Sequence, residues 1–161
     1  MTVTENDRYI DVRPVREADV PAVIELVRDV LGEFGLQFGE GAQTDEELAH
    51  LPSSYEANGG AFWVAVRGNE MLGTCGVFPV APGTFELRKM YLRPTSRGLG
   101  LGKRLLDEAL RWTRQIGGRR MVLDTTEQMV RAIEFYEANG FVRDDSEIRG
   151  SRCSRGYKRD L

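Results

Sequence analysis

The spacing of apolar residues predicts two kinds of element along the chain. An apolar residue recurs every three or four positions at Val20, Val23, Ile24, Val27 and Leu31, which is typical of a helix with one buried face. We expect this helix to begin with Asp19 as its N-cap and Pro21 in its first turn, and to end at Gly32. A glycine-rich loop over residues 32–41 should follow. The capping-box-like run at 44–47 then predicts a short second helix near Leu48.

Short apolar runs bounded by turn residues predict strands. Residues 9–13 give a first strand, and the runs at 61–66, 71–80 and 84–92 give three strands in hairpin succession. A turn at 67–70 separates the first two of these three, and Pro82-Gly83 separates the last two.

Helical spacing returns in the second half of the chain. A helix over 102–116 should end at Gly117-Gly118, and a second helix over 128–138 should end at Asn139-Gly140. Short strands are expected at 121–123, from Phe141, and at 157–161. Strands joined by a crossover helix should pair in parallel with right-handed sense. The prediction is an α+β fold of three-layer type, whose mixed, mostly antiparallel sheet of about six to seven strands is flanked by about four helices.

Length and composition narrow the class of protein. A chain of 161 residues predicts one domain over 1–161, with residues 1–8 frayed. It has no apolar run near the ~20 residues that span a bilayer, and its polar N-terminus lacks a signal peptide. Two cysteines exclude a disulfide scaffold, and the single histidine, His50, makes a zinc site or a serine triad improbable. We therefore expect a cytoplasmic, metal-free protein with no membrane partner.

The net charge of −3 hides an uneven distribution. Residues 1–80 carry 5 basic and 14 acidic side chains, whereas residues 81–120 carry 10 basic and 3 acidic ones. The overall balance argues against a nucleic-acid binder. The basic segment instead directs attention to the residues between Glu86 and Gly102.

This segment places a glycine-rich turn between a strand and a helix. Gly98, Gly100 and Gly102 let backbone N–H groups approach a ligand closely, and the helix aims its unpaired N–H groups at the same point. Basic side chains surround the turn at Arg97, Lys103 and Arg104. Together these features predict a site for a pyrophosphate. The alternative is an ordinary glycine-rich turn with solvated basic residues.

Two other phosphate-binding patterns fail at specific positions. The dinucleotide fingerprint G-x-G-x-x-G requires glycine at 103 or 105, where the chain has Lys103 and Leu105. The pattern G-x-x-x-x-G-K-[ST] requires glycine at 97 and serine or threonine at 104, where the chain has Arg97 and Arg104.

The pattern that fits is Arg-x-x-Gly-x-Gly at Arg97, Gly100 and Gly102. The run from Ala132 to Phe141 also matches A-x-x-F-Y-x-x-x-G-F. With these two motifs in this order, the chain resembles the GCN5-related N-acetyltransferases (the GNAT superfamily). The element order is similar over residues 8–161, and the sequence is similar over about 84–142.

The resemblance implies acetyl-CoA as co-substrate and a primary amine of a small molecule or peptide as acceptor, with no nucleic acid and no metal. It implies contacts to the co-substrate from Met90, Tyr91, Leu92, Arg97, Gly98, Leu99, Gly100, Leu101, Gly102, Lys103, Arg104, Thr125, Met129 and Tyr136. For Met90, Tyr91 and Leu92 the contacts would come from main chain freed by a bulge. Many relatives carry asparagine at the position of Met129, so that contact is either lost or supplied by Thr125, Thr126 or Gln128.

The resemblance also implies two catalytic side chains. Glu86 would take a proton from the amine, sometimes through a water molecule, and Tyr136 would give a proton to the departing thiolate. Alternatively, Glu86 pairs with Arg88 or another cation on the sheet face, and Tyr136 fills the core. Two further alternatives remain for the whole chain, a non-catalytic acyl-CoA sensor and a nucleotide-phosphate binding protein.

The acceptor site is expected between the first two helices and the late strands, as a monomer or homodimer. Acidic residues gather in that early region at Glu33, Glu40, Asp45, Glu46, Glu47 and Glu56, which would suit a cationic amine. A solvated acidic helix face is the alternative. Arg149, Arg152 and Arg155 could instead bind a carboxylate on the acceptor.

Overall fold

The computed structural model describes residues 9–39 and 43–161. The segment expected to fray, 1–8, and the last part of the glycine-rich loop, 40–41, lie outside these residues. None of the helices described is long and apolar enough to cross a membrane.

Seven strands form one twisted sheet in the order β1-β2-β3-β4-β5-β7-β6. Their bounds are β1 Asp11–Pro14, β2 Ala61–Arg67, β3 Glu70–Ala81, β4 Thr84–Leu92, β5 Arg120–Thr125, β6 Val142–Arg143 and β7 Arg155–Asp160. β4 and β5 pair in parallel, and every other neighbouring pair is antiparallel. The predicted mixed, mostly antiparallel sheet is confirmed.

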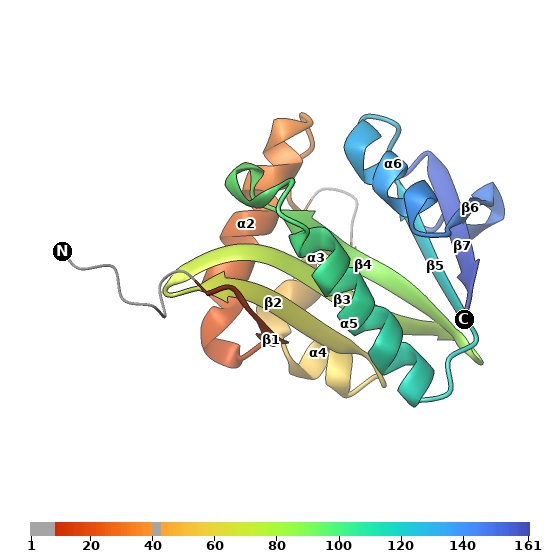
Figure 1. The fold of residues 1–161 in the computed structure, drawn as a ribbon, viewed down its shortest axis with the longest axis horizontal. Coiled ribbons are helices and arrows are strands. Elements are labelled where there is room, and N and C mark those ends of the chain that lie inside the picture. Colours follow the sequence, from red (N-terminus) through yellow and green to blue (C-terminus); the bar gives the residue numbers. More distant parts are fainter. Residues whose placement is uncertain (1–8, 40–42) are drawn as a thin grey trace.

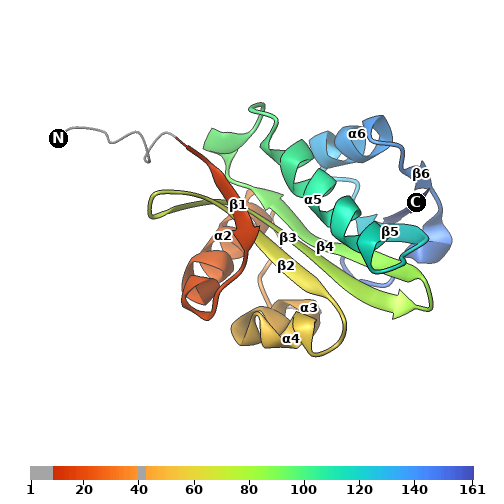
Figure 2. The same cartoon turned by 60° about the horizontal axis from the view of Figure 1, so that its bottom comes forward.

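Helices cover both faces of the sheet (Figures 1 and 2). α5 (Leu101–Gln115) and α6 (Val130–Ala138) pack on one face, and α2 (Val20–Glu33) packs on the other with α3 (Gln43–Glu46) and α4 (Ser53–Glu56). The alternation of side chains along β2 explains the two cores. Trp63 and Ala65 face the α5 side, whereas Phe62 and Val64 face the α2 side.

Several boundaries differ from the sequence-based prediction. The predicted capping box is wrong, because Thr44 lies inside α3 and Leu48 follows in a 3₁₀ turn, η2 (Glu47–His50). α4 was not predicted, and α6 begins at Val130 rather than at 128. Asp19 does precede α2, but its side chain does not cap the helix. Its carboxylate pairs with Arg13 at 2.7 Å and accepts a hydrogen bond from the Arg16 N–H at 2.8 Å.

The pairing of β4 with β5 is short. It covers Thr84, Phe85 and Glu86 opposite residues 120–122, and beyond these positions the two strands run on without pairing to each other. In Figure 1 they lie side by side at their starts and separate toward α6. Because of this separation, residues in the middle of β4 line two cavities, which are described below.

Candidate active site

β4 contains a bulge next to the point where it leaves β5. Thr74 of β3 pairs with Tyr91 and Gly76 pairs with Arg88, so two steps along β3 match three steps along β4. Lys89, in the bulge, has φ 52°, a left-handed conformation that is unfavourable for a residue with a long side chain. The Thr74 hydroxyl donates a hydrogen bond to the Lys89 carbonyl at 2.7 Å. The bulge that the family resemblance implied is therefore present, immediately before Met90–Leu92.

A buried ion-pair cluster stabilises this bulge through the side chain of Lys89. The Asp45 carboxylate binds the Lys89 amine and also accepts two hydrogen bonds from the Arg152 guanidinium, at 2.9 and 3.1 Å. It further accepts from the Gly39 N–H at 2.8 Å. Burial alone would raise the pKa of Asp45, but Arg152 and Lys89 outweigh burial and hold that pKa below its ordinary value. One carboxylate thus joins the chain before α3, the bulge of β4 and the segment before β7.

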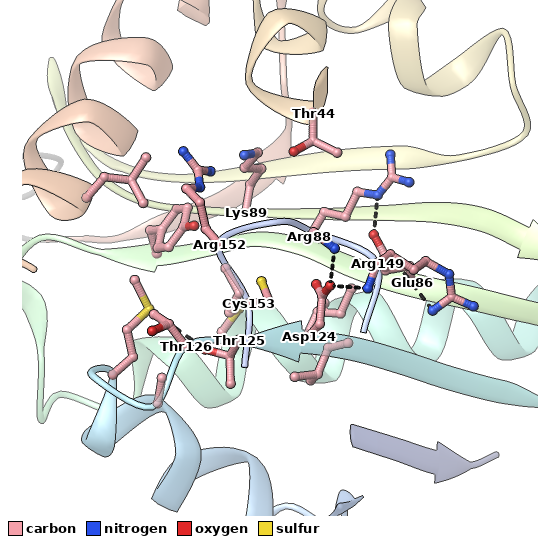
Figure 3. Close-up of a pocket in the computed structure, with 18 of the residues that line it drawn as sticks. Thr44, Glu86, Arg88, Lys89, Asp124, Thr125, Thr126, Arg149, Arg152 and Cys153 are labelled. Carbon is pink, nitrogen blue, oxygen red and sulfur yellow. Dashed lines mark hydrogen bonds and ion pairs between the residues drawn. The ribbon is translucent and has the colours of Figure 1, made fainter. Parts of the chain in front are cut away.

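Glu86 lies in a second cluster, nearer the start of β4 (Figure 3). Its Oε1 accepts a hydrogen bond from Arg88 Nε at 2.5 Å, and Arg149 lies 3.6 Å from its Oε2. The side chain is only 6% exposed, yet Oε2 has no hydrogen-bond partner among the residues described. Burial raises the pKa of Glu86, with Arg88 opposing the shift. Glu86 therefore pairs with Arg88 through one carboxylate oxygen and leaves the other without a hydrogen bond.

Two cavities meet beside the bulge. The first, of about 400 Å³, is lined by Lys89 and Arg152 of the first cluster, by Glu86, Arg88 and Arg149 of the second, and by Asp124 (Figure 3). The Asp124 Oδ2 accepts hydrogen bonds from the Arg149 and Gly150 N–H groups at 2.7 Å each. The second, of about 610 Å³, is more apolar and is lined in part by Arg97, Gly98 and Gly102, in the glycine-rich loop that joins β4 to α5. Five residues line both cavities, namely Met90, Tyr91, Met129, Ala132 and Tyr136. Groups bound in the two cavities could react with each other at this junction.

Tyr136 stands at that junction on α6. Phe135 and Phe141 contact its ring edge-on, each with ring centroids 5.7 Å away. Burial raises the pKa of Tyr136, so its hydroxyl stays protonated at neutral pH. A protonated hydroxyl can act as a proton donor to a group bound in either cavity.

The glycine-rich loop presents open backbone beside the second cavity. Gly98 and Gly100 have φ of 79° and 75°, and a Cβ built on either would meet nothing within 4 Å. Gly100 is the N-cap of α5 and offers no side chain to the first N–H groups of the helix. The loop thus combines conformations that favour glycine, unobstructed space and a helix N-terminus, which fits a pyrophosphate.

The basic residues around this loop have partners within the protein. Arg97 pairs with Glu33 of α2 at 2.8 Å and donates to the Leu92 carbonyl at 3.0 Å. Lys103 pairs with Asp107 at 3.1 Å, and Arg104 donates to the Ile10 carbonyl at 3.0 Å. The backbone of the loop is consequently better placed than these side chains to hold phosphate.

The predicted site residues divide among the cavities. Glu86 and Thr125 line the first cavity, and Leu92, Arg97, Gly98 and Gly102 line the second. Met90, Tyr91, Met129 and Tyr136 line both. Leu99, Gly100, Leu101, Lys103 and Arg104 line neither, and Leu101 is buried in the core.

The acidic wall expected for the acceptor does not line the first cavity within the part of the chain that the structure describes. Three of its carboxylates form ion pairs within the protein: Glu33 with Arg97, Asp45 with Lys89, and Glu47 with Arg88. Sequence reasoning missed Lys89 altogether and treated Asp45 only as a helix-start and acidic-wall residue, whereas the alternative pairing of Glu86 with Arg88 is present. No local signal marks these residues, because the Asp45 pairs span 44 and 107 positions.

Comparisons with known proteins agree with this geometry. The model of the acetyltransferase (GNAT) family matches residues 25–141. An uncharacterized N-acetyltransferase of Escherichia coli (strain K12), YjgM, is 36% identical over 131 residues, which cover 79% of this chain and 78% of that protein. An uncharacterized N-acetyltransferase of Schizosaccharomyces pombe is 36% identical over 118 residues, with 72% of each chain covered.

Solved structures show the same fold. A GNAT-family acetyltransferase from Staphylococcus aureus superposes with a TM-score of 0.87 at 24% identity, covering 95% of this chain and 99% of that one. The PaiA N-acetyltransferase from Thermoplasma acidophilum, solved with coenzyme A, gives a TM-score of 0.75 at 19% identity, covering 95% and 99%.

The Asp45 cluster yields a stability prediction. Asp45→Asn leaves Lys89 and Arg152 buried without a counter-charge, so the free energy of unfolding should fall by about 3–5 kcal/mol in urea denaturation. Because the pKa of Asp45 is lowered in the folded state, the whole decrease in the free energy of unfolding should be seen at neutral pH. It should shrink as the pH falls below about 4, where the wild-type carboxylate also becomes protonated.

The matched control is Glu46→Gln, which removes the neighbouring exposed carboxylate. We expect it to change the free energy of unfolding by less than about 0.5 kcal/mol. Equal effects of the two substitutions would show that Asp45 does not hold the fold at this point.

Proposed function

The chain belongs to the GNAT acetyltransferase family and is an N-acetyltransferase, and from this premise we propose that it transfers an acetyl group from acetyl-CoA directly to a primary amine of a small molecule or peptide. The observation that carries the proposal is the junction of two unlike cavities at Met90, Tyr91 and Tyr136. The second cavity would take the co-substrate, and the first would take the amine.

The co-substrate side rests on the loop and on β4. The N–H groups of the loop and of the first turn of α5 would hold the pyrophosphate. The free edge of β4 from Met90 to Leu92 would pair with the extended pantetheine arm as a further strand would. When bound, acetyl-CoA supplies the thioester that is attacked. Main-chain N–H groups beside the bulge would stabilise negative charge that develops on the carbonyl oxygen.

Glu86 is the proposed base. Its Oε2, which accepts no hydrogen bond among the residues described, could take a proton from the amine directly or through one water molecule. Burial raises the pKa of Glu86, which makes it a stronger base than an exposed carboxylate. Tyr136 is the proposed acid, because it lines both cavities and burial keeps its hydroxyl protonated.

Direct transfer is favoured over a route through an acetylated cysteine. Cys75 is fully buried in the core. Cys153 lines the first cavity, but burial raises its pKa to about 12, so very little thiolate is available at neutral pH. An amine placed by the first cavity needs no covalent relay.

Binding of the co-substrate can be tested at the loop. Gly100→Ala places a methyl group in the open space beside the helix N-terminus, and its φ of 75° disfavours alanine. We expect the Kd for acetyl-CoA, measured by calorimetry, to rise at least tenfold. The control is Gly117→Ala at the other end of α5, where φ is 87° and the space is equally open. That variant should carry a similar backbone cost but keep the wild-type Kd.

The role of Glu86 can be tested by its pH profile. The base form is required, so kcat/KM should fall as the pH drops through the raised pKa of Glu86, above the ordinary carboxyl range. Glu86→Gln should lower kcat about 10²–10⁴-fold and remove this acidic limb while acetyl-CoA still binds. Glu134→Gln, on the exposed face of α6, should retain both kcat and the limb. Unchanged turnover in Glu86→Gln would favour a different base or a non-catalytic sensor.

The role of Tyr136 can be tested by removing its hydroxyl. Tyr136→Phe keeps the ring packing but loses the proton donor, and we expect kcat to fall about tenfold or more with little change in the KM for acetyl-CoA. Tyr157→Phe is the matched variant, because Tyr157 is also buried but bonds Glu137 and lines neither cavity. Parallel losses in both variants would indicate a structural effect rather than proton donation.

A further inference from the structure

The two ends of the first cavity differ in charge balance. At the end formed by the β4 bulge, Lys89 and Arg152 share the carboxylate of Asp45, and within residues 9–39 and 43–161 neither has another ion-pair partner. Two cations and one anion leave one positive charge in excess. The three side chains are 4%, 18% and 0% exposed, so water screens that charge poorly.

The other end has the opposite imbalance. Arg88 and Arg149 face the three carboxylates of Glu86, Glu47 and Glu147. Asp124 lies beside them, and its Oδ2 accepts hydrogen bonds from two backbone N–H groups rather than from a cationic side chain. Figure 3 shows Glu86, Arg88 and Arg149 grouped apart from Lys89 and Arg152.

A buried charge in excess is unfavourable until a ligand of opposite sign neutralises it. The excess positive charge opens onto the cavity, since Lys89 and Arg152 both line it. A carboxylate bound there would gain charge-assisted hydrogen bonds from a guanidinium and an ammonium. The amine of the same molecule would be drawn to the negative end, where the free Oε2 of Glu86 lies.

We propose that the acceptor is an amine that carries its own carboxylate, of the amino-acid type, and that Lys89 and Arg152 form the subsite for that carboxylate. This proposal rests on the proposed acetyl transfer and names its substrate class. It favours amino acids over polyamines, whose second ammonium would face the Lys89–Arg152 end. Arg152 acts here as a specificity-determining residue.

The test compares amines that differ only in the carboxylate. L-methionine, L-methioninamide and 3-(methylthio)propylamine share one side chain, and equivalent sets can be made for other amino acids. Release of coenzyme A is followed with saturating acetyl-CoA. We expect kcat/KM for the acid to exceed that for the amide by about tenfold to a hundredfold, mainly through KM. The amide has the less basic amine, so any bias from deprotonation works against this result.

Arg152→Gln removes the excess charge while leaving the Lys89–Asp45 pair in place. The preference for the acid over the amide should fall toward one, and Arg152→Lys should give an intermediate preference because the charge is kept and the forked geometry is lost. Arg143→Gln is the matched control, since Arg143 is exposed, pairs with Asp145 and lines neither cavity. It should keep the wild-type preference. Unchanged affinity for acetyl-CoA shows that each variant is folded.

Calorimetry supplies a readout that does not require turnover. With coenzyme A bound, L-methionine or another amino acid should bind more tightly than its amide, and Arg152→Gln should abolish the difference. The proposal is overturned if amides or simple amines react and bind as well as the acids, or if Arg149→Gln rather than Arg152→Gln removes the preference. If acetyl-CoA binds but no amine of any class releases coenzyme A, the proposed transfer itself fails, whatever the acids do in calorimetry.

Discussion

The parting of β4 from β5 after three residue pairs is the constraint on which the site depends. β5 continues by pairing with β7, and β4 continues by pairing with β3, so no strand fills the space between them. The free edge of β4 exposes main-chain donors and acceptors that an open sheet would otherwise pair. Both cavities and the junction at Tyr136 lie along this opening. A sheet paired over its full length could hold the same side chains and offer no site.

The bulge in β4 is the second requirement, and it is maintained by long-range contacts. A lysine at φ 52° destabilises the folded chain, and interactions with residues nearby in the sequence do not offset this. The Thr74 hydroxyl and the Asp45 carboxylate supply the compensating interactions, one to the Lys89 carbonyl and one to its amine. Since Asp45 also binds Arg152, the elements that would hold the acceptor are tied to the strand that would hold the acyl group. Stability and site geometry therefore share one buried carboxylate.

The periodicity of the sequence was sufficient to predict the fold but not the polar lining of the first cavity. The sheet and the long helices followed from apolar spacing, because that spacing determines which face is buried. The short helix α4 escaped prediction, since a four-residue helix has too few turns to show a period, and α3 was predicted from its acidic run rather than from a period. Glu86 and Tyr136 were proposed through the family resemblance. Lys89 and Arg152 join Asp45 across 44 and 107 positions, so only the folded chain reveals that they share it.

The uneven distribution of charge along the sequence is explained by ion pairs within the fold, and it is therefore not evidence for a bound anion. Acidic residues of the first half pair with basic residues of the 81–120 segment, as in Asp29–Arg93, Glu33–Arg97, Asp45–Lys89 and Glu47–Arg88. These pairs attach α2 and the chain after it to β4 and to the loop that follows. Lys103, Arg111 and Arg120 pair with Asp107, Glu108 and Asp160, so seven of the ten basic residues of the segment have a carboxylate partner within the fold. A basic segment in a sequence is therefore weak evidence for an anionic ligand. The stronger evidence is a local imbalance that pairing leaves behind, and in this chain it lies at Lys89 and Arg152 rather than at the glycine-rich loop.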